Sequence, residues 1–193
     1  ARRNPYKASM KGSIPVNVLT RVSSANAAPL DLDINLDHAD MNALALFFNP
    51  VTSAEGPIKG YVKVSGAWDD PELRGDVSVK NGRIELLTLH DPIFPLNMDV
   101  KFDGKSATVE GNAIFGTGKS SVKGGLEWDR GAIIAYNGEA HLHAPDIHSD
   151  YYKGSLDADF GLGEVMDVPG IEGNIHVHDA LVEFPLTLLQ IQA

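Results

Sequence analysis

A strict two-residue alternation of apolar and polar side chains runs through most of this chain. Residues 30–37 read Leu-Asp-Leu-Asp-Ile-Asn-Leu-Asp, residues 96–103 read Leu-Asn-Met-Asp-Val-Lys-Phe-Asp, and residues 155–162 repeat the pattern. Because successive side chains of a β-strand point to opposite faces, each segment predicts a strand with one apolar and one polar face. The question about function is therefore what covers the apolar face.

The spacing of turn residues predicts an all-β protein. Nineteen glycines and eleven prolines separate alternating segments of roughly 8–10 residues. Short connections such as Asn81-Gly82 and Asp103-Gly104 favour antiparallel hairpins, and we expect roughly 11–13 strands. The same one-sided pattern extends from residue 14 to residue 184, which favours one long curled sheet forming an open hydrophobic trough over a closed sandwich or barrel.

One segment departs from the strand pattern. Residues 40–48 are apolar nearly all round, with Asp40 as an N-cap and Asn49-Pro50 as a stop signal. This predicts a short helix of about two turns that packs on the apolar face.

Composition limits the class of protein. A chain of 193 residues is one domain or a segment of a larger protein, and its Ala1-Arg2-Arg3-Asn4 start and apolar end favour the segment. No run approaches the ~20 apolar residues of a membrane span. The absence of cysteine excludes disulfides and zinc–thiolate sites, and the net charge of −10 argues against nucleic acid and anionic bilayer surfaces as partners.

Histidines are the only candidates for metal binding or catalysis. His141 and His143 form one i, i+2 pair, and His176 and His178 form another. Two such pairs on adjacent strands could bind zinc, but they fall in the polar phase, so we expect solvent-facing histidines and no metal. With no nucleophile or carboxylate pair that stands out, we expect neither an enzyme nor a cofactor.

Two short motifs resemble known signatures without their context. Trp68-Asp69 and Trp128-Asp129 resemble a propeller dipeptide, but they lie 60 residues apart instead of ~40–45. Residues 116–121 (Gly-Thr-Gly-Lys-Ser-Ser) resemble a phosphate loop but lack its spacing and a following helix, so they predict a hairpin turn.

A wider pattern of glycines, prolines and alternation resembles the TamB family, within the AsmA-like superfamily. It runs through residues 66–75 (Gly-Ala-Trp-Asp-Asp-Pro-Glu-Leu-Arg-Gly), 77–84 up to an Asn-Gly turn, a proline segment at 91–96 and the strand 98–102, and it ends at Gly116-Thr117-Gly118. The upstream alternating strand and short helix also match. Coverage is best over residues 30–130.

What the resemblance implies is specific. Members are large proteins, anchored in the inner membrane, that cross the periplasm of diderm bacteria, with a plastid-envelope relative in plants. Their β-rich body resembles a taco-shaped trough lined with aliphatic side chains. The family is associated with phospholipid transport toward the outer membrane and with outer-membrane biogenesis through a barrel-assembly partner. We therefore expect a periplasmic segment of a bridge-like lipid transfer protein.

The residues support the same hypothesis, because an acyl chain needs a continuous water-excluding surface but no directional bonds. We expect Leu44, Phe47 and Phe48 of the helix to act as a plug or lip. The predicted lipid-binding groove consists of the apolar-phase residues Ile58, Val62, Val64, Leu73, Val77, Val79, Ile84, Leu86, Leu96, Met98, Val100, Phe102, Val109, Phe115, Val122, Leu126, Ile134, Leu142, Leu156, Phe160, Ile175 and Val177.

Two alternatives remain open from the sequence. A scaffold or chaperone for outer-membrane β-barrel proteins would act by strand pairing and needs exposed edge strands. A closed structural β-sandwich or adhesin module would leave no large exposed apolar patch.

Overall fold

A computed structural model of the chain describes residues 7–14, 29–42, 50–87, 89–149, 152–165 and 168–182. In these ranges eleven strands form one sheet, and no α-helix is present. The strands are β1 (Lys7–Ser13), β2 (Leu30–Asp40), β3 (Val51–Glu55), β4 (Pro57–Ala67), β5 (Asp70–Leu86), β6 (Ile93–Gly104), β7 (Ser106–Phe115), β8 (Gly118–Asp129), β9 (Ala132–His148), β10 (Tyr152–Val165) and β11 (Val168–Val182). The predicted all-β fold is confirmed.

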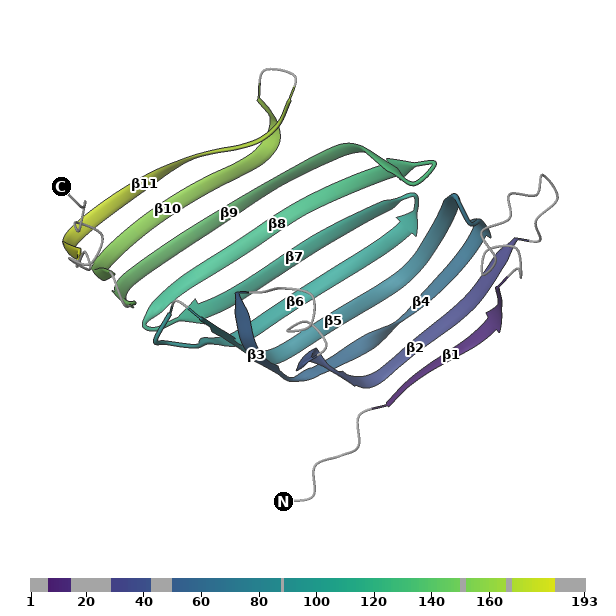
Figure 1. Cartoon of the computed structure of the whole chain (residues 1–193), viewed down its shortest axis with the longest axis horizontal. Helices are drawn as coiled ribbons and strands as arrows, with labels where there is room; N and C mark the ends of the chain where they lie inside the picture. Colours follow the sequence, from purple (N-terminus) through teal and green to yellow (C-terminus); the bar gives the residue numbers. More distant parts are fainter. Residues whose placement is uncertain are drawn as a thin grey trace, which may run out of the picture.

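The sheet follows the order of the chain. Its strand order is β1-β2-β4-β5-β6-β7-β8-β9-β10-β11, every pair is antiparallel, and β3 pairs with β5 off this path. The sheet is curved and not closed, with β1 and β11 at opposite ends (Figure 1). A sandwich requires two facing sheets, whereas the described residues form one, so the sandwich alternative is wrong as a fold.

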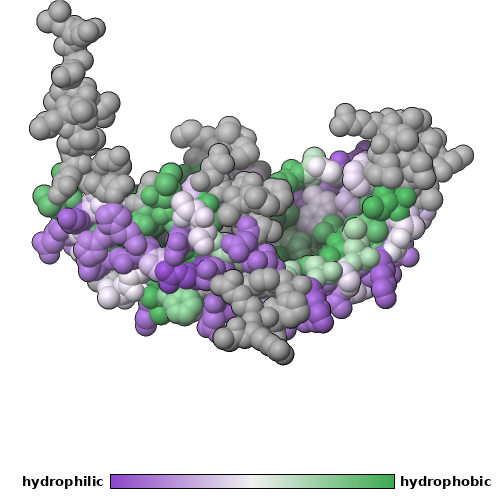
Figure 2. All heavy atoms as spheres, turned by 60° about the horizontal axis from the view of Figure 1, so that its bottom comes forward, coloured by the Kyte–Doolittle hydropathy of each residue, from purple (hydrophilic) through white to green (hydrophobic). Residues whose placement is uncertain are grey.

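The register keeps the two phases of the alternation on separate faces across many strands. Val77, Val100 and Val109 lie opposite one another on β5, β6 and β7, whereas Asp76 pairs with Lys101 in the other phase. We call the side that carries the three valines the apolar face and the other side the polar face. Figure 2 shows hydrophobic residues gathered inside the hollowed side of the sheet and hydrophilic residues along its outer side.

Among the described residues, buried side chains form two small clusters on the sheet. Cluster 1 contains Met41, Ala54 and Val79, with Val51, Ile58, Ile84, Leu96 and Met98 packed against it. Cluster 2 contains Phe115, Ala144 and Ile147, with Leu89, Ile93, Leu142, Tyr152 and Leu156 around it. Toward β11 the apolar side chains are much more exposed, reaching 71% at Ile171 and 58% at Ile175. Within the described residues, a single layer of strands thus leaves a large part of its apolar face without a second layer.

The segment predicted to be helical is described only at its start. Asp40 is the last residue of β2, and Met41 and Asn42 form a short 3₁₀ turn. The Asp40 carboxylate accepts the backbone N–H of Asn42 at 2.9 Å, which is the contact an N-cap makes. Residues 43–48, including the predicted lip residues Leu44, Phe47 and Phe48, lie outside the described residues.

Glycine is required where neighbouring strands approach closely. Gly75 on β5 lies between Val62 and Phe102 in the register and has a φ of 135°. A Cβ at this position would lie 1.9 Å from the carbonyl oxygen of Tyr61, a backbone atom that cannot rotate away. Both the left-handed φ and this close approach exclude a side chain at residue 75.

Replacing Gly75 with Ala should therefore lower the free energy of unfolding by more than about 1 kcal/mol. Urea denaturation of Gly75→Ala measures the loss. Gly163→Ala is the matched control, because a Cβ on Gly163 would meet no atom within 4 Å. Equal stability of the two variants would contradict the steric explanation.

Candidate functional site

The apolar face contains two adjacent open hollows. The first, hollow 1, has a volume of about 660 Å³ and extends over β5 to β11 beside clusters 1 and 2. The second, hollow 2, has a volume of about 750 Å³ and lies over β6 to β11. Both volumes are within the roughly 300–1,000 Å³ typical of small-molecule sites.

Many of the residues predicted to line a groove line these hollows. Hollow 1 includes Ile84, Leu96, Met98, Phe115, Val122, Leu142, Leu156, Phe160 and Val177. Hollow 2 includes Val100, Phe102, Val109, Val122, Leu126 and Phe160. Lys123 and Glu139 also border hollow 2, but they belong to the polar phase of the register, and Lys123 forms a 3.5 Å ion pair with Glu110 there.

The remaining predicted groove residues lie outside both hollows. Ile58 and Val79 belong to cluster 1, and Leu86 pairs with Val51 on β3. The others are Val62, Val64, Leu73 and Val77, which lie in register on β4 and β5, together with Ile134 and Ile175. Ile133 lines hollow 2 where Ile134 was expected. The reason is that the register of β8 and β9 shifts between Glu127 and Trp128, which interrupts the alternation.

Two kinds of lining residue were missed by sequence reasoning. Ala140 and Gly138 are in the apolar phase of β9, but their small size made them poor candidates for a groove. Leu89 and Ile147 come from a connection and from a strand end, where alternation gives little guidance. Only the phase of Ala140 and Gly138 could have identified them.

A charged contact joins three turns along one rim of the sheet, which we call the Lys105 rim. Lys105, in the β6–β7 turn, donates to Asp70 at 2.6 Å and to Asp129 at 2.7 Å. These hydrogen bonds, first that of Asp129 and then that of Asp70, raise the pKa of Lys105. In turn, the hydrogen bond from Lys105 lowers the pKa of Asp70.

Two further hydrogen bonds strengthen this rim and join β5 to β8 and to the turn that follows it. The indole N–H of Trp128 donates to the carbonyl oxygen of Pro71 at 2.9 Å, and the backbone N–H of Arg130 donates to Asp70 at 3.0 Å. In a flat sheet, β5 and β8 would be about 14 Å apart, since β6 and β7 separate them. Their ends therefore lean together over the short β6–β7 turn. The two Trp-Asp dipeptides do not indicate a propeller, but they belong to turns that meet here.

The opposite rim, which we call the His148 rim, has a similar contact. Leu89 forms an isolated antiparallel bridge with Ser149, and the backbone N–H of His90 donates to the carbonyl oxygen of His148 at 3.1 Å. The His148 ring also lies 3.6 Å from Asp91 and 3.4 Å from Asp146. The β5–β6 connection thus reaches the end of β9 past the ends of β7 and β8.

At the same end of the sheet as the His148 rim, the β7–β8 connection at 116–117 is the predicted hairpin turn, with Phe115 opposite Gly118. A Cβ on Gly116 in this turn would lie 3.0 Å from the carbonyl oxygen of Asp146, so the turn passes close beneath the His148 rim.

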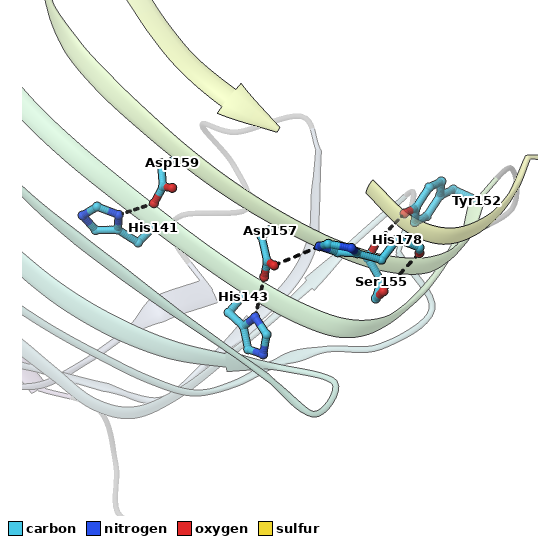
Figure 3. Close-up of polar contacts among 7 residues, drawn as sticks. All are labelled: His141, His143, Tyr152, Ser155, Asp157, Asp159 and His178. Atoms are coloured by element: carbon cyan, nitrogen blue, oxygen red, sulfur yellow. Dashed lines mark hydrogen bonds and ion pairs between the residues drawn. The ribbon is translucent and has the colours of Figure 1, made fainter. Parts of the chain in front are cut away.

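The two predicted histidine pairs lie on the polar face, with His141 and His143 on β9 and His176 and His178 on β11 (Figure 3). His141 contacts Asp159 at 2.5 Å, and Asp157 accepts from His143 and, at 3.1 Å, from His178. The hydrogen bond to Asp159 raises the pKa of His141, and the hydrogen bond from His143, assisted by that from His178, lowers the pKa of Asp157. These contacts join β9, β10 and β11 on the side away from the hollows.

The described part of the chain holds no cluster of three or more His, Cys, Asp or Glu side chains suited to a metal ion. Nor does that part hold a helix long and apolar enough to cross a membrane. Its buried side chains are all apolar. No protein-family model, curated protein or solved structure matches the chain.

Replacing Lys105 with Met should loosen the Lys105 rim and lower stability slightly, because two partly exposed ion pairs are lost. Hydrogen exchange should become faster in the β4–β5 and β8–β9 turns together. Lys101→Met, on the polar face of β6, is the control and should leave both turns unchanged. Faster exchange in only one turn would contradict a shared contact.

The histidine contacts should contribute to stability at intermediate pH and lose that contribution at both higher and lower pH. The contribution of His141 is complete below its ordinary pKa of 6.5 and is lost as pH rises through the raised value. The contribution of Asp157 is complete above 3.8 and is lost as pH falls through the lowered value. Urea midpoints of His141→Gln should therefore decline less than those of the wild type above pH 6.5. Parallel pH curves would rule out the His141 contribution.

Proposed function

We propose that this chain holds the acyl chains of lipids in a hydrophobic trough formed by its curved sheet, as a segment of a bridge-like lipid transfer protein. The observation that carries the proposal is the pair of adjacent, open and apolar hollows on a face that no second layer of the described residues covers. On this proposal the chain performs no chemical reaction and needs no cofactor.

The chemistry of the lining supports an acyl ligand. Neighbouring side chains on the apolar face, such as Leu96, Met98 and Val100, offer contact surface without a hydrogen-bonding group. Each methylene that leaves water for such a surface gains roughly 0.8 kcal/mol. Since this interaction has no direction, an acyl chain can slide along the lining without breaking specific bonds.

The cellular setting is proposed on the resemblance of residues 30–130 to the TamB family. We propose the periplasm of a diderm bacterium as the location, with a plastid envelope as the less favoured setting, and phospholipids moving toward the outer membrane as the cargo. The full-length protein would be anchored in the inner membrane and would act with an outer-membrane barrel-assembly protein.

A scaffold for barrel proteins is the second candidate, and the open edges of the sheet favour it. Within the described residues, β1 and β11 each pair on one side only, so both present unpaired backbone groups there. An incoming strand can add to such an edge. This activity would depend on the edges, whereas lipid binding would depend on the hollows.

A charge in the lining should separate the two candidates. Val100→Glu places a carboxylate in hollow 2 and should reduce binding and transfer of a fluorescent phospholipid by about tenfold or more, because the charge must stay hydrated. Lys101→Glu, one residue further on the polar face, is the matched control and should bind normally.

Circular dichroism and urea denaturation should show that both variants fold. Normal lipid binding by a folded Val100→Glu protein would count against the trough and favour the scaffold.

A further inference from the structure

We propose that the two hollows are separate subsites for the two tails of one diacyl lipid, a hypothesis that rests on the proposed lipid-binding function. The hollows share only three lining residues, namely Val122, Ala140 and Phe160. These three lie opposite one another in the register of β8, β9 and β10, so they form a single row between the hollows. We call it the dividing row.

The side chains of the dividing row lean away from its centre. On the β7 side, the Val122 side chain extends over Gly111: one of its Cγ atoms lies 3.2 Å from the position that a Cβ on Gly111 would occupy. A ring carbon of Phe160 lies 2.7 Å from the place a Cβ on Gly173 would take, toward β11. Ala140, between them, carries only a methyl group. The side chains of the row are therefore smallest at Ala140 and larger on both sides of it. The space above Ala140 can take the part of a lipid that joins its two tails.

The lengths of the hollows match one tail each. Along β9, hollow 2 extends from Ile133 to Ala140 and hollow 1 from Ala140 to Ile147. At about 3.3 Å per residue, each of these spans is roughly 23 Å long. One leaflet of a bilayer accounts for about 15 Å of hydrocarbon thickness, so each hollow is long enough for one tail.

The similar volumes of the two hollows, about 660 and 750 Å³, favour two similar ligands over one. A single tail would leave the other hollow exposed to water. Two tails that diverge from Ala140 would cover both.

Charge complementarity favours a headgroup that carries a cation. The whole chain has a net charge of −10. An anionic headgroup would be repelled, whereas the ammonium group of a zwitterionic headgroup would be attracted.

The test counts bound lipids by native mass spectrometry, with probes that share one headgroup. Palmitoyl lysophosphatidylcholine has one tail and dipalmitoyl phosphatidylcholine has two. We expect the wild-type chain to bind two molecules of the first or one of the second. Dipalmitoyl phosphatidylglycerol, with the same tails and an anionic headgroup, should bind more weakly at low salt.

Two variants fill one hollow each. Gly138→Leu fills hollow 2, since a Cβ on Gly138 makes only contacts of 3.4 Å or longer, and Ser120→Leu fills hollow 1. Each should bind one single-tail lipid instead of two and should lose diacyl affinity by at least about tenfold. Ala135→Leu, an exposed residue paired with Glu127 in the polar phase of β9, is the control and should keep both stoichiometries.

The outcomes are distinct. One single-tail lipid per wild-type chain, or loss of all lipid by a folded single-hollow variant, would overturn the two-subsite proposal while leaving the proposed function standing. Absence of any lipid on the wild type would overturn the proposed function itself. Equal binding of the two headgroups would contradict the charge argument alone.

Discussion

The structure depends on an antiparallel register that, despite local bulges, keeps the apolar and polar phases apart across ten successive strands. Because side chains alternate with a period of two, a slip of one residue in any pair would move the apolar side chains of that strand to the polar face. The register keeps Val77, Val100 and Val109 in one line and directs the charged residues to the other side. Both hollows exist only because these apolar rows stay aligned from strand to strand.

The contacts along the rims turn this aligned sheet into a concave one. At the Lys105 rim, Lys105 and Trp128 join ends of strands that the sheet order separates by two others. At the His148 rim, the bridge between Leu89 and Ser149 does the same. Glycines such as Gly75 permit the close backbone approach that the curvature demands. The hollows lie within the part of the sheet that these contacts span.

The sequence predicted the class of fold and much of the lining, because alternation is a local property. Strand type, antiparallel pairing and the apolar phase of residues such as Met98 and Leu142 could be read directly from it. The role of Ala140 in the dividing row could not be read from the alternation, because it depends on the space that the neighbouring side chains leave above the methyl group. Ile134 was displaced by a register shift that no local pattern reveals. The rim contacts join residues up to 60 positions apart, and only the curvature of the sheet brings them together.

The placement of the rim contacts has a mechanical consequence. They connect strands from β5 to β9, whereas within the described residues β1, β2 and β4 on one side and β10 and β11 on the other are outside their span. Bending the centre requires breaking contacts between distant strands, while bending either flank only requires adjustment between neighbours. The centre of the sheet is therefore expected to resist bending more than its two flanks.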